Sequence, residues 1–167
     1  MSDREPKVAV IMGSDSDLSV VSKAIDILKE FEIYYEVRIL SAHRTPEVTA
    51  RYAKGAEEAG FEVIIAAAGK AAHLPGVIAS YTTLPVIGIP IKSSELDGMD
   101  ALLSIVQMPP GIPVATVGIG GAQNAGLLAI EILSIKYNHL KDELKLYRKK
   151  MQDNVLKKDE KFRTENL

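Results

Sequence analysis

The stretch Val8-Ala9-Val10-Ile11-Met12-Gly13-Ser14-Asp15-Ser16-Asp17 determines the class of fold that this chain can adopt. Its apolar part does not alternate with polar residues, which predicts a strand buried on both faces, as in a parallel sheet. The glycine, serines and aspartates that follow form a loop. Apolar residues then recur at three- and four-residue spacing from Leu18 to Phe31, which predicts an amphipathic helix. The stretch therefore predicts a strand–loop–helix unit.

The same unit recurs along the chain. Apolar segments at about 35–40, 61–68, 84–91 and 114–119 are each followed by a loop and a helical pattern. Five strands that alternate with helices predict a three-layer α/β domain with a five-stranded parallel sheet and right-handed crossovers. The helix after the fourth strand is expected to bury Leu102, Leu103 and Val106.

The length of 167 residues predicts a single domain over 1–167, with a core at about 7–137. A helical extension is expected at about 139–158 and a disordered tail after it. This extension carries a narrow apolar stripe, which must be buried in a groove of its own domain or of a neighbouring subunit. The stripe consists of Leu140, Leu144, Tyr147, Met151 and Val155.

Composition excludes several classes of protein. Lys and Arg number 20 against 22 Asp and Glu, and this net charge of −2 predicts neither nucleic acid nor a membrane as a partner. The absence of cysteine excludes disulfides, thiolate metal sites and a cysteine nucleophile. No apolar run is long enough for a membrane span, and the polar segment Met1–Lys7 lacks an apolar signal region, so we expect a cytoplasmic protein.

The polar loops lie where an open parallel sheet binds ligands, beyond the carboxyl ends of its strands. The loop 13–17 offers hydroxyls and free N–H groups that suit a phosphate, although capping of the next helix explains its serines equally well. The loop 41–46, Ser-Ala-His-Arg-Thr-Pro, offers a hydroxyl, an imidazole and a guanidinium. On its own such a pair of His and Arg is more typical of a solvated loop. Beside a phosphate loop, Arg44 becomes a candidate phosphate ligand and His43 a candidate general acid and base.

Other motifs are incomplete. The stretch Gly118-Ile119-Gly120-Gly121-Ala122-Gln123 begins like a dinucleotide fingerprint, but it has Gln at the third glycine and follows the last strand rather than the first. The three histidines, His43, His73 and His139, lack the spacing of metal ligands. We therefore expect neither a metal nor a dinucleotide cofactor.

Five motifs in this order resemble the PurE family of purine biosynthesis, over about residues 7–155. They are Met12-Gly13-Ser14-Asp15-Ser16-Asp17, Ser41-Ala42-His43-Arg44-Thr45-Pro46, Ala71-Ala72-His73-Leu74-Pro75-Gly76, Ser104-Ile105-Val106-Gln107-Met108-Pro109 and Asn124-Ala125. The family has two branches. Ala71–Gly76 and Arg44 resemble the branch that converts N5-carboxyaminoimidazole ribonucleotide to its C4-carboxylated isomer, whereas the branch that uses CO2 directly differs at both places.

The resemblance implies a flavodoxin-like fold, an octamer whose C-terminal helix packs on a neighbouring subunit, and a ribonucleotide substrate handled without a cofactor. It implies that Ser14 and Arg44 hold the 5′-phosphate, that Asp17 binds the ribose hydroxyls and that His43 carries the proton. The remaining substrate-binding residues that it implies are Ser16, Ser41, Ala42, Gly69, Lys70, Ala71, His73 and Leu74.

One position departs from the family. Lys70 stands where a second glycine is usual before Ala-Ala-His. Its side chain could crowd the pocket, or could point outward and add positive charge near the carboxylate. Two alternatives to the isomerase therefore stay open at this point: a non-catalytic ribonucleotide-binding oligomer, and a carboxylase that uses CO2 directly.

Overall fold

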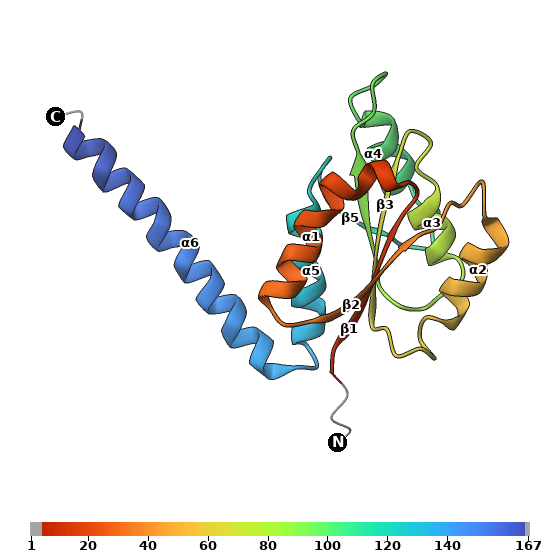
Figure 1. The fold of residues 1–167 in the computed structure, drawn as a ribbon, viewed down its shortest axis with the longest axis horizontal. Coiled ribbons are helices and arrows are strands. Elements are labelled where there is room, and N and C mark those ends of the chain that lie inside the picture. Colours follow the sequence, from red (N-terminus) through yellow and green to blue (C-terminus); the bar gives the residue numbers. More distant parts are fainter. Residues whose placement is uncertain (1–4, 166–167) are drawn as a thin grey trace.

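The computed structural model describes residues 5–165, and these residues form a parallel sheet between two layers of helices (Figure 1). The strands are β1 (Lys7–Met12), β2 (Tyr34–Ile39), β3 (Val63–Gly69), β4 (Val86–Ile91) and β5 (Ala115–Thr116). They lie in the order β2-β1-β3-β4-β5. This order is that of the flavodoxin-like doubly wound fold, as expected, and its strand order reverses between β1 and β3.

Helices cover both faces of the sheet. They are α1 (Leu18–Glu30), α2 (Pro46–Gly55), α3 (Leu74–Ala79), α4 (Met99–Val106), α5 (Ala122–Ser134) and α6 (Asn138–Glu165), and a short 3-10 turn, η1 (Asp15–Asp17), precedes α1. The helices α1 and α5 pack together on one face, while α2, α3 and α4 cover the other. The three-layer prediction is confirmed.

The core explains why β1 reads as a continuous apolar run. Val8 and Val10 contact the layer of α1 and α5, whereas Ala9 and Ile11 contact the opposite layer, and all four are fully buried. The register pairs Met12 with both Ile39 and Ala67. The carboxyl ends of β1, β2 and β3 therefore lie at one level, and their loops meet there.

The fifth strand is shorter than the predicted 114–119 because of Pro90. The carbonyl of Pro90 accepts a hydrogen bond from the N–H of Gly120 (2.9 Å), which shows that this residue faces β5. Proline has no N–H to return a bond, so the ladder stops after Thr116.

The prediction for α4 is wrong in part. Leu103 and Val106 are 49% and 48% exposed, and the residues that face the sheet are Ala101 and Ile105, which are fully buried. Apolar residues surround this short helix on nearly every side, so the sequence alone does not reveal which face packs on the sheet.

The helix α6 extends beyond its predicted end at about 158 and leaves the body of the molecule (Figure 1). Ion pairs one turn apart, Lys161 with Glu165 and Arg163 with Asp159, support the segment that was expected to be disordered. Leu140 is buried and Leu144 and Tyr147 pack on the core, but Met151 and Val155 are exposed. The N-terminal residues 1–4 and the tail residues 166–167 lie outside the described part of the chain.

None of the helices within residues 5–165 is both long and apolar enough to cross a membrane.

Candidate active site

A pocket of about 550 Å³ lies at the carboxyl ends of β1 to β4, where the strand order reverses. It contains every residue that the sequence predicted for the site: Ser14, Ser16, Asp17, Ser41, Ala42, His43, Arg44, Gly69, Lys70, Ala71, His73 and Leu74. The three loops after β1, β2 and β3 therefore form one site, as the parallel topology requires.

The loop after β1 is held by hydrogen bonds among its own side chains. The Ser14 Oγ accepts from the Ser16 backbone N–H (3.3 Å) and the Ser16 Oγ (2.9 Å), and it donates to the Asp15 carboxylate (3.1 Å). The first of these bonds caps the turn η1 at its N-terminus. Ser14 thus has a capping role, and both Ser14 and Ser16 still line the pocket.

Asp17 is a carboxyl group in the wall of the pocket, only 8% exposed. It stands at the N-cap position of α1, but its side chain makes no capping bond. Burial raises the pKa of Asp17 above the usual aspartate value, while the hydrogen bond from Ser16 and the charge of Arg44 act in the opposite direction. A buried acceptor of this kind suits ligand hydroxyl groups.

The loop after β2 is fixed by hydroxyl groups from α2. The Thr45 Oγ1 accepts from the Ser41 backbone N–H (3.0 Å) and donates to the Ser41 carbonyl (3.1 Å). The fully buried Thr49 also donates to that carbonyl (3.3 Å). Thr45 occupies the N-cap position of α2, but its hydroxyl closes this loop instead of capping the helix.

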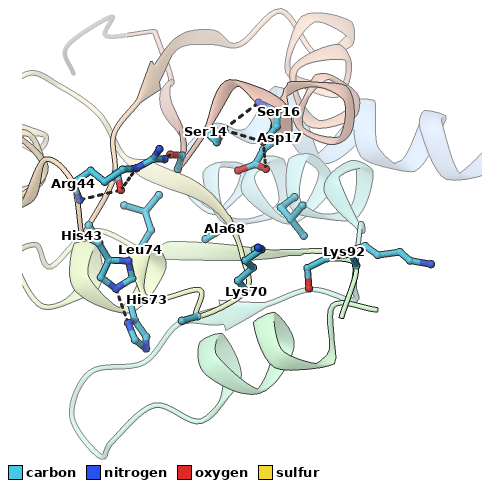
Figure 2. Close-up of a pocket in the computed structure, with 18 residues that line it drawn as sticks. Ser14, Ser16, Asp17, His43, Arg44, Ala68, Lys70, His73, Leu74 and Lys92 are labelled. Atoms are coloured by element: carbon cyan, nitrogen blue, oxygen red, sulfur yellow. Dashed lines mark hydrogen bonds between the residues drawn. The ribbon is translucent and has the colours of Figure 1, made fainter. Parts of the chain in front are cut away.

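Arg44 bridges the loops after β1 and β2 (Figure 2). Its Nη2 donates to the Gly13 carbonyl (2.7 Å) and its Nε to the Ser41 Oγ (3.3 Å). These bonds hold the planar guanidinium at the edge of the serine loop. Its Nη1 hydrogens and one Nη2 hydrogen stay available for an anion.

His43 is hydrogen-bonded to His73 from the loop after β3 (Figure 2). The bond joins His43 Nε2 to His73 Nδ1 at 2.9 Å, and the two rings meet edge to face. One of these nitrogens must donate and the other accept. The bond therefore fixes the orientation of His43 and leaves its Nδ1 for a ligand.

The loop after β4 completes the wall and was not assigned to the site from the sequence. It contributes Lys92, Ser93 and Ser94, beside Ile91 at the end of β4. The signal was available, because β4 is a parallel strand whose carboxyl end must lie at the same edge as the others. The pairing of Gly69 with Ile91 brings this end beside the loop of Lys70.

Potential metal ligands do not cluster in this pocket. Within residues 5–165 no group of three or more His, Asp or Glu side chains is arranged to hold a metal ion.

Comparison with known proteins identifies the family. The family model described as AIR carboxylase matches residues 7–154. The chain belongs to this family. An N5-carboxyaminoimidazole ribonucleotide mutase from Pyrococcus abyssi is 65% identical over 88% of this chain and 84% of that protein. A protein of the same name from Mycobacterium tuberculosis is 56% identical over 92% of this chain and 88% of its own length.

Solved structures agree with the family assignment. The crystal structure of Treponema denticola PurE superposes with a TM-score of 0.84 at 32% identity, and the match covers 94% of this chain and 98% of that one. The resemblance to PurE is thereby confirmed over nearly the whole chain, and so is the fold.

Proposed function

We propose that this protein is an N5-carboxyaminoimidazole ribonucleotide mutase, an isomerase of purine biosynthesis. The relatives that carry this name are 56–65% identical over most of the chain. The observation that carries the proposal is the hydrogen bond between His43 and His73, because it orients a proton carrier in the same pocket as a partly free guanidinium. A ribonucleotide carries a phosphate and a base, and this pocket offers an anion-binding guanidinium and a proton carrier.

The phosphate and ribose are bound at the loops after β1 and β2. Arg44 and Ser14 hold the 5′-phosphate, with Ser16 and Ser41 beside them. Asp17 accepts hydrogen bonds from the ribose hydroxyls, since its carboxylate is buried against the same loop. The aminoimidazole then reaches the loops after β2 and β3, where Ala42, Gly69, Lys70, Ala71, His73 and Leu74 line the pocket.

The reaction needs one proton carrier. When the bond between the exocyclic nitrogen and its carboxylate carbon breaks, the electron pair stays on nitrogen, CO2 is released and the His43 imidazolium protonates that nitrogen. The electron-rich C4 then attacks CO2, and the now neutral His43 removes the C4 proton to restore the aromatic ring. His43 ends in its starting state, and His73 keeps the ring in place throughout.

Retention of CO2 beside C4 replaces a bimolecular encounter with a reaction inside one pocket. Such an arrangement lowers the barrier by up to about 7–11 kcal/mol in well-oriented systems. Leu74, only 3% exposed, and the partly buried Ala42 provide an apolar wall that suits CO2.

The test follows the carboxylate carbon. The purified protein is incubated with substrate labelled with ¹³C in its N5-carboxylate, in unlabelled bicarbonate, and the C4-carboxylated product is analysed by NMR. A mutase transfers the label to C4. Loss of the label, together with a dependence on bicarbonate, would establish the direct carboxylase in its place, and failure to convert a substrate that binds would leave a non-catalytic binding protein.

The variant His43→Asn examines the proton carrier. General acid–base catalysis contributes roughly 10²- to 10⁴-fold to a rate, so turnover should fall by at least that factor while ribonucleotide binding persists. His139→Asn is the matched control, because His139 lies on α6 against Tyr137, away from the pocket. Normal turnover in His43→Asn would remove His43 from its role.

We further propose that the chain acts as a single domain in a cytoplasmic homo-octamer, with α6 packed on a neighbouring subunit. The exposed apolar residues of α6, Met151 at 52% and Val155 at 65%, support such a contact, because an apolar stripe on a projecting helix gains stability by burial. The mass in solution, measured by light scattering, tests the assembly.

A further inference from the structure

Lys70 adopts a backbone conformation that lysine normally avoids. Its φ angle is +56°, in the left-handed region, at the point where the chain leaves β3. This conformation is unfavourable for a residue other than glycine. Residues held in this way cluster at binding sites, and Lys70 lies in the wall of the pocket.

The Lys70 ammonium makes no direct bond to an acid in the described part of the chain. Two other cations line the pocket, and both are engaged: Arg44 with Gly13 and Ser41, and Lys92 with Asp97 at 2.9 Å. Within residues 5–165, Lys70 forms neither a hydrogen bond nor an ion pair within 4.0 Å.

No acid in the pocket neutralises Lys70. Asp17, the buried carboxyl of the pocket wall, forms no ion pair with Lys70, and the cation that lowers its pKa is Arg44. The exposed Glu95 does feel Lys70, but its pKa is lowered first by hydrogen bonds from Ser94 and from its own backbone, and only then by the charge of Lys70.

The directions of the two lysines differ. In Figure 2 the Lys70 side chain extends from the loop after β3 toward the middle of the pocket, whereas Lys92 extends away from it. Arg44 comes from the loop after β2 and is hydrogen-bonded to the loop after β1. The pocket therefore offers two cationic groups on separate loops, and a ligand with two separate anionic groups would match both.

We propose that Lys70 is a specificity-determining residue that binds the carboxylate of the substrate and of the product. This inference rests on the proposed function, which supplies a ligand with a phosphate at one end and a carboxylate at the other. Arg44 takes the phosphate and Lys70 the carboxylate. A lysine is suited to this task, because its ammonium is a compact charge on a flexible stem and can follow the carboxylate from nitrogen to C4.

The consequence is a preference among ligands. The ammonium stabilises both carboxylated ribonucleotides but not aminoimidazole ribonucleotide, which has lost the carboxylate. Lys70 therefore retains substrate and product and disfavours the complex that contains only the decarboxylated intermediate.

The experiment compares two ligands by calorimetry on the full chain: the C4-carboxylated aminoimidazole ribonucleotide and aminoimidazole ribonucleotide itself. Lys70→Met keeps the length of the side chain and the backbone strain but removes the charge. Lys70→Arg keeps the charge. Lys29→Met is the matched control, because it removes an equal charge from a residue that pairs with Asp26 on α1 and does not line the pocket.

We expect Lys70→Met to lower the affinity for the carboxylated ligand about 10-fold, equivalent to about 1.4 kcal/mol. The affinity for aminoimidazole ribonucleotide should stay unchanged. Lys70→Arg should restore most of the preference, and Lys29→Met should not alter it. The proposal is overturned if Lys70→Met changes the affinity for both ligands equally or changes neither affinity. It is also overturned if the native chain binds neither ligand. If the preference depends on Lys70 but the labelled substrate is not converted, the proposed function fails and the carboxylate site stands.

Discussion

The substitution Arg44→Met tests whether the pocket recognises a phosphate. Methionine removes the guanidinium but retains an unbranched apolar side chain of similar reach. The Arg44 Nη2 and Nε already bind the Gly13 carbonyl and the Ser41 Oγ, so the remaining hydrogens of the guanidinium point to whatever fills the space beside the serine loop. In our proposal, the 5′-phosphate of the ribonucleotide fills that space.

The size of the effect follows from the type of bond. A hydrogen bond to a charged group contributes about 1.5–3 kcal/mol net. Loss of one such bond to the phosphate lowers the affinity for the ribonucleotide by roughly 10- to 150-fold. The same nucleoside without its phosphate makes no such bond, so its affinity should be unchanged.

Calorimetry with the ribonucleotide and the matching ribonucleoside measures this difference. The change in free energy for the nucleoside is subtracted from that for the nucleotide, which removes any general damage to the loop. Arg38→Met is the control, because Arg38 lies on β2, just before the loop of Arg44, pairs with Glu36 at 3.5 Å and does not line the pocket.

Two results would refute this reasoning. Arg44→Met could weaken nucleotide and nucleoside equally, in which case Arg44 only supports the loop. Alternatively, the variant could bind the nucleotide as tightly as the native chain, and the phosphate would then lie elsewhere.

Two further substitutions test how the site depends on its surroundings. Asp17→Asn should raise the free energy of unfolding at neutral pH, because burial raises the pKa of Asp17 and its charged form opposes folding. This gain should shrink as the pH falls through the raised pKa, because native Asp17 is then protonated in the folded state. Urea unfolding at neutral and acidic pH measures this gain, and a gain that grows toward acidic pH would contradict the cause given. Gly88→Ala should lower the free energy of unfolding by about 1–3 kcal/mol. The added Cβ would overlap Ile105 Cγ2 and lie 3.1 Å from Val114 Cγ1. The control Gly55→Ala, with no neighbour within 4 Å, should instead be neutral or slightly stabilising, and equal losses in both variants would refute the packing argument.

The fold class and the general position of the site follow from the sequence. Val8 to Met12 is apolar at every position because both faces of β1 are covered, and only a parallel sheet between two helical layers covers a strand in this way. Once the strands are parallel, their loops must meet at one edge. The residues of the loops 13–17, 41–46 and 69–74 could therefore be assigned to one pocket before any distance was known.

Packing between elements lay beyond the sequence. Which face of α4 packs on the sheet was misjudged, because Leu103 and Val106 are as apolar as the buried Ile105. The length of β5 depends on Pro90, which lies on the neighbouring strand rather than on β5 itself. Both features arise from contacts between segments, and the local pattern does not contain them.

Within the site, the sequence named the chemical groups and the tertiary structure gave them their relations. His43 and His73 are separated by thirty residues in the chain, yet their rings are joined by a hydrogen bond of 2.9 Å because β2 and β3 flank β1. Lys70 could have pointed outward or into the pocket, and its left-handed backbone and its orientation were determined by the fold. The physical reason is that residue type fixes which bonds a side chain is able to make, whereas only the packed sheet fixes which partners lie within reach.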